Sequence, residues 1–466
     1  MDGQTPAMES EQVDVVVIGM GPGGEEVAGK LTEAGLAVVG VEAELVGGEC
    51  PYWGCIPSKM MIRAAHLLAE AGRIPGMAGT ATVEPDWGPV AARIRQEATD
   101  TWDDTVAVDR FVGKGGRFVR GRGRLAGPGR VEVEGADGQR LAFQAARAVV
   151  LASGTTASIP PIDGLADVPY WTNREAIAAP EAPASLVVLG GGAVGAELAQ
   201  AFARFGTEVT VVEAADRLLP LEEPEAGAVV AEAFAADGIT VIAGVGAARV
   251  AHSDDGVTVT LADGRTLTAE RLLVATGRRA DPAAVGADTV GVDPGARRVP
   301  TDERQRVADG VWAVGDVTGE GAFTHVAMYQ AHVAVADILG RDHHPAEYRA
   351  LPRVTFTDPE VGSVGLSEAA AREQGIPVAV GSTPVPSTAR GWIHKAGNEG
   401  LIKLVADTDR GVLVGATSAG PAGGEVLGLL VLAVHAQVPL ATLRSMIYAY
   451  PTFHRGIEDA LRDLDA

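Results

Sequence analysis

The sequence predicts an α/β protein with two doubly wound parallel units and a smaller α+β domain at the C-terminal end. Short apolar runs of the kind that form buried parallel strands occur twice, each followed by a glycine-rich turn, a helical pattern and a second apolar run. After about residue 350 the pattern changes to strands with helices between and after them, without a further glycine-rich turn of this type. A chain of 466 residues is long enough for several hydrophobic cores.

The composition excludes several classes of protein. The chain carries 38 Lys and Arg against 61 Asp and Glu, and the resulting net charge of −23 repels nucleic acid and anionic lipid. Charged residues interrupt the apolar runs before any of them reaches the roughly 18 residues of a membrane span. The first dozen residues lack the basic and apolar segments of a secretory signal. We therefore expect a disordered tail over residues 1–12 and a cytoplasmic enzyme that binds neither nucleic acid nor a membrane.

The first unit begins with the apolar run 13–18, which we predict to be a strand. Gly19-Met-Gly21-Pro-Gly-Gly24 follows, then a helical stretch, a second apolar run and Glu42. In such a βαβ unit the glycines let the backbone approach a pyrophosphate at the helix N-terminus, and the acid accepts a hydrogen bond from a ribose hydroxyl. Gly19, Gly21, Gly24 and Glu42 are therefore predicted to bind a nucleotide.

A second copy of this pattern occurs later in the chain. Its predicted strand, 186–189, leads into Gly190-Gly-Gly192-Ala-Val-Gly195, a helix, another apolar run and Glu213. In both copies the acid follows the first glycine by 23 positions. One such motif is weak evidence, because glycine turns are common in a chain with 60 glycines. Two complete copies with the same spacing predict two dinucleotide-binding (Rossmann-like) domains.

Three later apolar strands also end in turns of small residues. The turns are Ser153-Gly154-Thr155, Thr276-Gly277-Arg278 and Gly315-Asp316. The carboxyl ends of strands in a doubly wound sheet border the ligand crevice, so we expect Ser153, Gly154 and Gly277 to face bound nucleotide. Asp316 is predicted to bind a ribityl or ribose hydroxyl, and its alternative is a carboxylate that only shapes the turn.

Proline and histidine clusters mark plausible domain boundaries. They are Pro160-Pro161, the prolines between 180 and 183, and His343-His344-Pro345. The predicted division has a tail at 1–12, a first nucleotide domain at 13–160 that resumes at 282–347, a second nucleotide domain at 161–281, and a C-terminal domain at 348–466.

The only two cysteines, Cys50 and Cys55, lie shortly after Glu42. In a regular helix their Cα atoms would stand about 7.5 Å apart along the axis and on different faces, so the segment must bend to bring the sulfurs together. Pro51, Gly54 and Pro57 permit such a distorted helix start. A close lone pair in a cytosolic protein is typical of redox catalysis. The alternatives are two inert buried thiols or a zinc site, for which the sequence offers no second cysteine pair and no nearby histidine.

Taken together, these motifs resemble those of the class I pyridine nucleotide-disulfide oxidoreductases. The resemblance extends over the chain after residue 12 and is carried by Cys50-x4-Cys55-x-Pro-Ser-Lys59, the second glycine motif, the Val-Gly-Asp316 turn and Phe-Thr-Asp-Pro-Glu-Val-Gly-Ser-Val-Gly at 356–365. The family includes dihydrolipoyl dehydrogenase, glutathione reductase and mercuric reductase. The resemblance implies FAD in the first βαβ domain, a nicotinamide cofactor in the second, and a C-terminal domain that forms a homodimer.

The resemblance also implies roles for four residues. Cys55 would be the charge-transfer thiolate against the flavin, and Cys50 the interchange thiol that meets the substrate. Lys59 would lie beside flavin N5, paired with Glu197. A cation there would stabilise a thiolate and the negative charge that arrives with a hydride. The alternatives are a surface lysine and an ordinary acid on a helix face.

Glu213 bears on the choice of nicotinamide cofactor. An acid at the end of the second strand accepts a hydrogen bond from a free 2′-hydroxyl and repels a 2′-phosphate, which favours NADH. Arg217, four residues later, leaves NADPH possible.

The C-terminal segment departs from the family pattern. Members that reduce disulfides carry His-Pro-Thr-x-x-Glu, in which the histidine is the acid-base group and the glutamate orients it. Here Tyr450 stands at the histidine position and Arg455 at the glutamate position. A tyrosine, with a reference pKa near 10, is a poorer base at neutral pH, which counts against ordinary dihydrolipoyl dehydrogenase or glutathione reductase activity. Mercuric reductases similarly have tyrosine near this place, but the further cysteines typical of them are missing.

Four other residues receive structural interpretations. His454 is a possible substitute acid, but we expect it to begin a helix. His325 is expected at a helix start near the flavin. Tyr52 and Trp53 are expected to pack against the flavin domain, with an aromatic substrate entry as the alternative.

The sequence thus predicts an FAD-dependent NAD(P)H oxidoreductase that passes electrons from flavin to the Cys50–Cys55 disulfide and on to a small-molecule acceptor. One alternative is a reductase of a metal ion, a quinone or oxygen that draws electrons directly from the flavin. A second is a redox sensor in which the disulfide switches conformation. No resident metal site is predicted.

Overall fold

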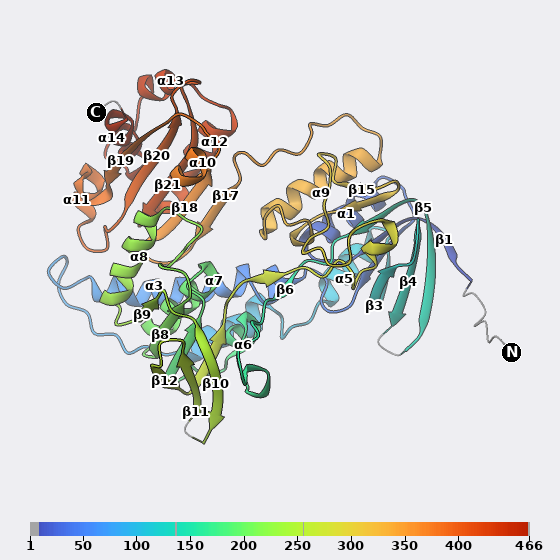
Figure 1. Ribbon diagram of the computed structural model, residues 1–466, viewed down its shortest axis with the longest axis horizontal. Helices are drawn as coiled ribbons and strands as arrows, with labels where there is room; N and C mark the ends of the chain where they lie inside the picture. Colours follow the sequence, from blue (N-terminus) through green and yellow to red (C-terminus); the bar gives the residue numbers. More distant parts are fainter. Residues whose placement is uncertain (1–8, 136–137, 255, 465–466) are drawn as a thin grey trace. The chain divides into compact units, whose positions relative to one another are not determined.

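The computed structural model describes residues 9–135, 138–254 and 256–464 (Figure 1). The chain divides into two compact units, each made of three segments. The first comprises Met1–Pro57, Arg95–Ser158 and Arg278–Glu347, and the second comprises Ser58–Ile94, Ile159–Gly277 and Tyr348–Ala466. None of the helices within the described ranges is long and apolar enough to cross a membrane.

The first unit is built on a seven-stranded sheet with the order β1-β2-β3-β4-β5-β16-β15, in which β1 also pairs with β5. Pairs β1–β2, β1–β5, β2–β3 and β5–β16 are parallel, whereas β3, β4 and β5 form an antiparallel meander. The elements are β1 Glu11–Ile18, α1 Pro22–Glu33, β2 Val38–Glu42, α2 Glu49–Tyr52, α5 Thr105–Gly113, β3 Arg117–Leu125, β4 Arg130–Gly135, β5 Arg140–Leu151, β6 Thr156–Ala157, β14 Arg278–Arg279, β15 Arg306–Ala308, β16 Val311–Ala313 and α9 Thr324–Ile338, with the π-helix η1 Ile94–Ala98 and the short 3-10 turns η3 Ala287–Val290 and η4 Asp316–Thr318.

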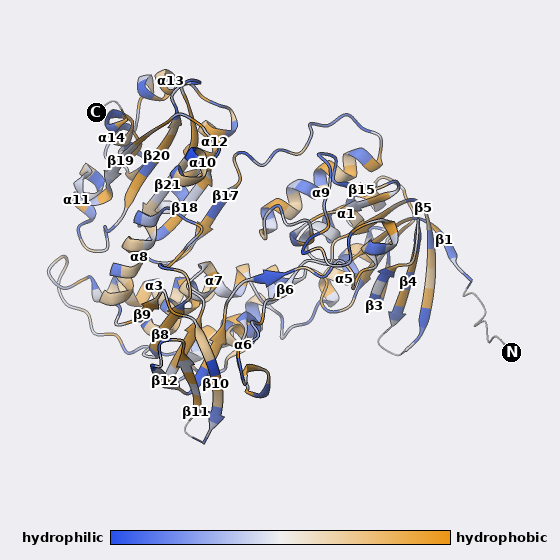
Figure 2. Ribbon diagram, in the orientation of Figure 1, coloured by the Kyte–Doolittle hydropathy of each residue, from blue (hydrophilic) through white to orange (hydrophobic). Residues whose placement is uncertain are grey.

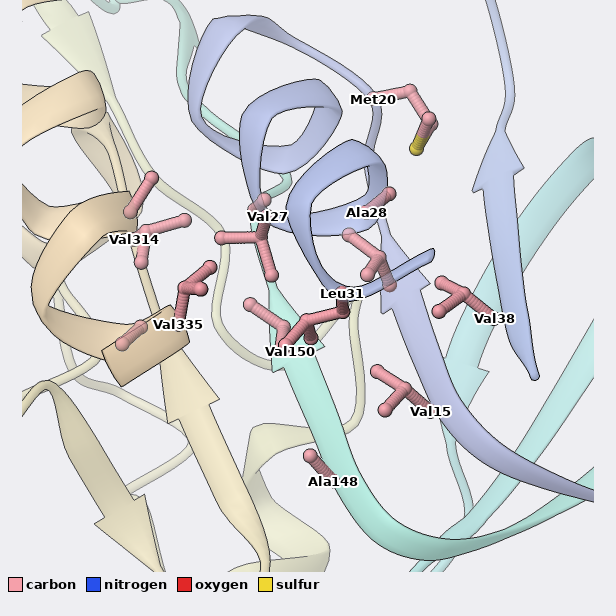
Figure 3. Packing of buried hydrophobic residues seen from close by; sticks show 14 of the residues in the cluster. Val15, Met20, Val27, Ala28, Leu31, Val38, Ala148, Val150, Val314 and Val335 are labelled. Carbon is pink, nitrogen blue, oxygen red and sulfur yellow. The ribbon is translucent and has the colours of Figure 1, made fainter. Parts of the chain in front are cut away.

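The strand β1 shows why this sheet forms. Its alternate residues Val15 and Val17 belong to the hydrophobic cluster on the side of α1, whereas Val16 and Ile18 belong to the cluster on the opposite face. Figure 3 shows the first cluster, where Leu31 of α1 lies among valines of the strands. A run of apolar residues is stable here because both faces of a parallel sheet are buried.

The second unit contains three sheets. A parallel sheet has the order β13-β7-β8-β9, an antiparallel sheet has the order β10-β11-β12, and a five-stranded antiparallel sheet has the order β17-β18-β21-β20-β19. The elements are α4 Gly88–Arg93, α6 Asn173–Ala178, β7 Ser185–Leu189, α7 Ala193–Arg204, β8 Glu208–Glu213, α8 Pro224–Ala236, β9 Thr240–Ala243, β10 Ala247–Ser253, β11 Gly256–Leu261, β12 Thr266–Ala269, β13 Arg271–Val274, β17 Pro352–Thr355, β18 Glu360–Gly365, α10 Glu368–Glu373, β19 Val378–Pro384, α11 Ala389–His394, β20 Leu401–Asp407, β21 Val412–Gly420, α12 Gly423–His435, α13 Leu440–Ser445 and α14 Gly456–Asp463, with the 3-10 turns η2 Leu165–Asp167, η5 Val385–Ser387 and η6 Phe453–Arg455.

Burial in these sheets follows their hydropathy. Every residue of β20 and β21 is buried, whereas β10 buries only Val250. Figure 2 shows a hydrophilic stretch on β10, consistent with one solvated face. The helix α3 Cys55–Gly72 starts in the first unit, and most of its length belongs to the second.

Both predicted βαβ units and the C-terminal α+β domain are present, so the predicted fold class is confirmed. The expected end of the tail at residue 12 is wrong, because β1 already starts at Glu11 and pairs Glu11 with Phe143 of β5. Residues 1–8 of that tail lie outside the described part of the chain. Residues 58–94, which we assigned to the first nucleotide domain, group with the second unit, and the functional domain division stays a prediction.

Candidate active site

The first glycine turn connects β1 to α1. Gly19 has a φ of +96°, and a Cβ on it would lie 2.4 Å from the carbonyl oxygen of Ala152. A Cβ on Gly24 would lie 2.0 Å from the carbonyl oxygen of Gly19, so α1 packs against the turn only with glycine there. Gly21 is different, because the nearest atom to its Cβ would be 4.0 Å away. The turn thus leaves bare backbone facing open space at the start of α1, which is the cradle that a pyrophosphate requires.

The acid that ends β2 closes this turn. The carboxylate of Glu42 accepts hydrogen bonds from the backbone N–H of Met20 at 2.7 Å and of Glu44 at 2.8 Å. Burial raises the pKa of the Glu42 carboxyl, and these two hydrogen bonds oppose the shift. Glu42 is therefore held at the carboxyl edge of the sheet, where the nucleotide motif requires an acceptor.

The second glycine turn repeats this construction between β7 and α7. Gly190 has a φ of +107°, and its Cβ would lie 2.4 Å from the carbonyl oxygen of Ala275. A Cβ on Gly195 would lie 2.0 Å from the carbonyl oxygen of Gly190, whereas a Cβ on Gly192 would meet nothing within 4 Å. Glu213 accepts from the backbone N–H of Gly191 at 2.6 Å. The residues of both turns therefore fit a bound dinucleotide.

The turn after β8 determines what Arg217 can reach. Its guanidinium donates to the carbonyl oxygen of Pro220 at 3.0 Å and to the carboxylate of Asp216 at 3.1 Å. Glu213 also accepts from the backbone N–H of Ala215 at 2.7 Å. Arg217 is thus engaged within its own loop.

Asp316 belongs to a hydrogen-bonded chain in the first unit. Its carboxylate accepts from the hydroxyl of Thr155 at 2.8 Å, and that hydroxyl accepts from Nε of Arg278 at 2.8 Å. Nη1 of Arg278 lies 3.6 Å from the carboxylate of Glu49, the residue before Cys50. Burial raises the pKa of Asp316, and the Thr155 hydrogen bond and the charge of Arg278 oppose that shift.

The other turn residues that we predicted to face nucleotide are sequence neighbours of Thr155 and Arg278, which belong to the hydrogen-bonded chain around Asp316. Ser153 is exposed, and Gly154 follows it with a φ of +64°. Gly277 has a φ of +111°, and a Cβ on it would meet nothing within 4 Å. Thr155 and Arg278 belong to the same turns, but sequence reasoning assigned them no role.

The two cysteines occupy two separate helices. Cys50 lies in the four-residue helix α2, Cys55 is the first residue of α3, and the chain turns between them at Trp53 and Gly54. The predicted break in the helix is therefore confirmed. Both cysteines are partly buried, and Sγ of Cys55 lies 3.5 Å from Oγ1 of Thr324, the first residue of α9. Sequence reasoning missed Thr324, which lies 269 positions away in the chain.

Cys50 lines a cavity of about 360 Å³ in the first unit. The walls come from α1, α2, α5 and α9, and they include Pro51, Glu25, Glu26, Arg110, Lys114 and Met328. Cys55 does not line it. The cavity thus gives a small molecule access to the first cysteine.

The irregular loop before α5 packs against the segment that carries the cysteines. The rings of Trp53 and Trp102 stack with their centroids 5.2 Å apart, and Tyr52 donates to the carbonyl oxygen of Asp103 at 3.5 Å. Burial raises the pKa of Tyr52, and nearby acids raise it further. These contacts support the packing interpretation of Tyr52 and Trp53. Nothing in the sequence connected Trp102 with the cysteines.

Lys59 and Glu197 form the predicted pair within the second unit. Nζ of Lys59 lies 2.7 Å from Oε2 of Glu197, whose side chain is only 7% exposed. The other carboxylate oxygen accepts from the backbone N–H of Phe356 at 2.8 Å, and Nζ lies 4.7 Å from the centre of the Phe356 ring. Glu197 therefore fixes the position of the ammonium group.

The C-terminal segment places Tyr450 at the surface. Its side chain is 70% exposed, and the guanidinium carbon of Arg455 lies 5.4 Å from the centre of its ring. Arg455 also pairs with Glu458 at 2.9 Å. His454 lies in the 3-10 turn η6 that leads into α14, and His325 is the second residue of α9, so both predictions of helix-start positions are confirmed.

Metal ligands are not gathered anywhere in the described part of the chain. No group of three or more His, Cys, Asp or Glu residues there is arranged to hold a metal ion. That the protein has no resident metal site stays a prediction from the sequence.

Comparison with known proteins identifies the family. Residues 13–336 match the model of the pyridine nucleotide-disulphide oxidoreductases, and residues 351–461 match the dimerisation domain of the same enzymes. The chain is 34% identical to dihydrolipoyl dehydrogenase of Halobacterium salinarum, covering 97% of this chain and 96% of that protein. It is 32% identical to mercuric reductase of Acidithiobacillus ferrooxidans, covering 98% of this chain and 83% of that protein.

Solved structures agree with this result. The crystal structure of LpdA from Mycobacterium tuberculosis has a TM-score of 0.84 at 27% identity, covering 98% of this chain and 100% of that one. The Cu(II) complex of the flavoprotein disulfide reductase RclA from Escherichia coli has a TM-score of 0.85 at 25% identity, covering 97% and 99%. The chain therefore belongs to the pyridine nucleotide-disulphide oxidoreductases, flavoprotein enzymes that bind FAD and NAD(P)H.

Proposed function

We propose that the protein transfers two electrons from NADH through FAD to the Cys50–Cys55 disulfide, and that the resulting dithiol reduces a small-molecule acceptor. The flavin, when bound, supplies the exchange between hydride and thiol chemistry. The observation that carries the proposal is the division of the cysteines, since Cys50 lines a cavity and Cys55 does not. This division supports Cys50 as the interchange thiol and Cys55 as the charge-transfer thiol.

The reaction with a disulfide acceptor follows from these positions. The Cys50 thiolate attacks one acceptor sulfur, the acceptor S–S bond breaks, and the leaving thiolate takes up a proton. Cys55 then attacks the Cys50 sulfur, a second acceptor thiol is released, and the protein disulfide is restored. Two thiols are oxidised and one acceptor disulfide is reduced.

Lys59 and Glu197 are proposed to support this cycle. The ammonium of Lys59 would stabilise negative charge on the flavin and on the Cys55 thiolate, because Cys55 and Lys59 are one turn apart on α3. Glu197 would keep the ammonium in place through the 2.7 Å contact. Replacing Glu197 by Gln should therefore weaken the thiolate-to-flavin absorption band.

The preference for NADH rests on the loop after β8. Glu213 stands where a 2′-hydroxyl donor is expected, and its charge repels a 2′-phosphate. The hydrogen bonds of Arg217 to Pro220 and Asp216 keep that guanidinium occupied within the loop. We therefore propose NADH as the physiological donor.

A leaving thiolate needs a proton donor, and the lack of the usual acid-base histidine favours a second candidate function. Tyr450 stands at the position of the acid-base histidine, and a phenol is a poor base near pH 7. A metal ion or a quinone takes electrons without that proton step at a thiolate. Two similar proteins are a mercuric reductase and a flavoprotein disulfide reductase with bound Cu(II), which favours a metal ion as the alternative acceptor.

The match of residues 351–461 to a dimerisation domain supports a homodimer. We propose that Tyr450 of this domain contributes to the site as the residue that replaces the histidine. Sedimentation of the purified protein should give a dimer, and a monomer with full activity would exclude this part of the proposal.

An anaerobic titration with NADH tests the central proposal. Reduction should produce a long-wavelength band from the Cys55 thiolate next to oxidised flavin, after which an acceptor panel of lipoamide, low-molecular-weight disulfides, quinones and Hg(II) identifies the substrate class. Absence of the band would exclude the assigned role of Cys55. Slow turnover with every acceptor, together with a partner bound in one redox state only, would instead indicate a redox sensor.

A further inference from the structure

Both cations that line the cavity at Cys50 form close ion pairs with a carboxylate, whereas one of the acids that line it has no Lys or Arg partner among the described residues. Nε of Arg110 donates to Oε1 of Glu25 at 3.0 Å, and Nζ of Lys114 lies 2.8 Å from Oε1 of Glu33 on the same helix α1. Each of these cations is therefore neutralised by a carboxylate of α1.

Glu26 is the acid that remains. Among the described residues its carboxylate has one close polar neighbour, with Oε1 lying 3.1 Å from Nε2 of His332 on α9. The imidazole of His332 is 64% exposed and lacks the permanent positive charge of an arginine or a lysine. The side chain of Glu26 is 22% exposed, so water screens its charge only in part.

We propose that the cavity at Cys50 selects neutral or positively charged acceptors over anionic ones, and that Glu26 sets this selectivity. The inference rests on the proposed function in one respect, that Cys50 is the thiol an acceptor meets. Glu26 lines the same cavity as Cys50, so its charge repels an anion that enters the cavity, whereas the paired Arg110 and Lys114 offer that anion little net attraction. A neutral molecule of the same shape meets no such repulsion.

Alkylation of the reduced enzyme measures this selectivity without turnover. The Cys50 thiolate displaces iodide from iodoacetamide or from iodoacetate, so that a C–S bond forms, the C–I bond breaks, and only the charge of the reagent differs. The NADH-reduced holoenzyme is treated anaerobically with each reagent at pH 8 and low salt, and labelling of Cys50 is followed by peptide mass spectrometry. We expect the ratio of the iodoacetamide rate to the iodoacetate rate to exceed that of mercaptoethanol, a neutral free thiol, by about three- to fivefold.

Two variants move the ratio in opposite directions. Glu26→Gln keeps the size of the side chain and should return the ratio to that of the free thiol. Arg110→Gln leaves Glu25 without its cation and should raise the ratio further. The control is Glu134→Gln, which removes the same charge from an exposed position on β4 that does not line the cavity and should change nothing.

The outcomes separate the two proposals. If Glu26→Gln leaves the ratio unchanged while Cys50 is labelled, the selectivity is disproved and the function of Cys50 stands. If neither reagent labels Cys50 in the reduced holoenzyme, the role of Cys50 as interchange thiol fails. A ratio equal to that of mercaptoethanol in the unmodified enzyme also overturns the selectivity.

A pair of acceptors gives the same comparison in turnover. Lipoamide and lipoate share one dithiolane ring and differ by a single negative charge. If the enzyme reduces them, kcat/KM should favour lipoamide, and Glu26→Gln should reduce this preference by about three- to fivefold, mainly through lipoate. An unchanged preference in Glu26→Gln would contradict the proposal.

Discussion

The two glycine turns are built alike, but the loops that follow their acids differ. In both turns a Cβ on the first glycine would lie 2.4 Å from a carbonyl oxygen, and a Cβ on the last glycine would lie 2.0 Å from the carbonyl oxygen of the first. After Glu42 the chain continues into the cysteine helix α2, whereas after Glu213 it forms a loop anchored by Arg217. The repeated part fits a nucleotide in each case. The two copies therefore differ in the loop after the acid, and only the loop after Glu42 leads to the cysteines.

Replacing Cys50 by Ser tests this difference most directly. Because the interchange thiol is the nucleophile, turnover of a disulfide acceptor should fall by at least about a thousandfold. Reduction of the flavin by NADH, for which we propose the second turn as the binding site, should continue at a similar rate. Stopped-flow absorbance measures both. Full turnover in Cys50→Ser would instead establish direct transfer from the flavin.

The last glycine of each turn should separate the two cofactors. In Gly24→Ala a Cβ would lie 2.0 Å from a backbone oxygen, an overlap that we expect to cost about 3 kcal/mol or more and to prevent stable flavin binding. In Gly195→Ala the same overlap arises in the second turn, so the protein should stay yellow but show a strongly raised KM for NADH. Flavin content and steady-state kinetics measure these effects. Loss of flavin from Gly195→Ala alone would contradict the assignment of the turns.

The local pattern of the sequence was sufficient to predict these turns. Strand, turn, helix and acid follow one another within about 30 residues, so the physics that connects them is short-ranged. The Lys59–Glu197 pair spans 138 positions and was predicted only through the family resemblance. Thr324 and Trp102 had no such signal, because their contacts with Cys55 and Trp53 depend on tertiary packing.

Glu213→Ala tests the coenzyme preference. Loss of a charged acceptor for a ribose hydroxyl should lower kcat/KM for NADH by roughly tenfold and leave NADPH less affected. Glu208→Ala is the matched control, since it removes the same charge from an exposed side chain at the other end of β8. Arg217→Ala should not weaken NADPH use, because its guanidinium already binds within the loop. A loss of NADPH activity in that variant would contradict the proposed preference.

The stacked rings of Trp53 and Trp102 hold the cysteine segment against the loop before α5. Trp102→Ala removes the ring that packs on Trp53, and we expect a loss of about 2 to 3 kcal/mol together with a weaker charge-transfer band. Trp102→Phe keeps an aromatic ring and removes an indole N–H that is buried without a hydrogen-bond partner among the described residues, so it should be much milder. Thermal unfolding and the NADH titration measure the two effects. Equal losses in both variants would show that stacking is not the cause.

The smallest expected effect concerns the backbone of that loop. Asp100, Thr101 and Trp102 all have positive φ, with +61° at Thr101, where a β-branched residue costs about 1 to 2 kcal/mol. Thr101→Gly removes this cost but adds about 0.5 to 1 kcal/mol of chain entropy to the unfolded state. The net expectation is a stabilisation of about 0.5 kcal/mol. Thr101→Ala shortens the side chain but keeps a Cβ in the left-handed region, so it should stabilise the protein less than Thr101→Gly does. If Thr101→Gly instead destabilises the protein, the contacts of the Thr101 side chain contribute more free energy than the strain costs.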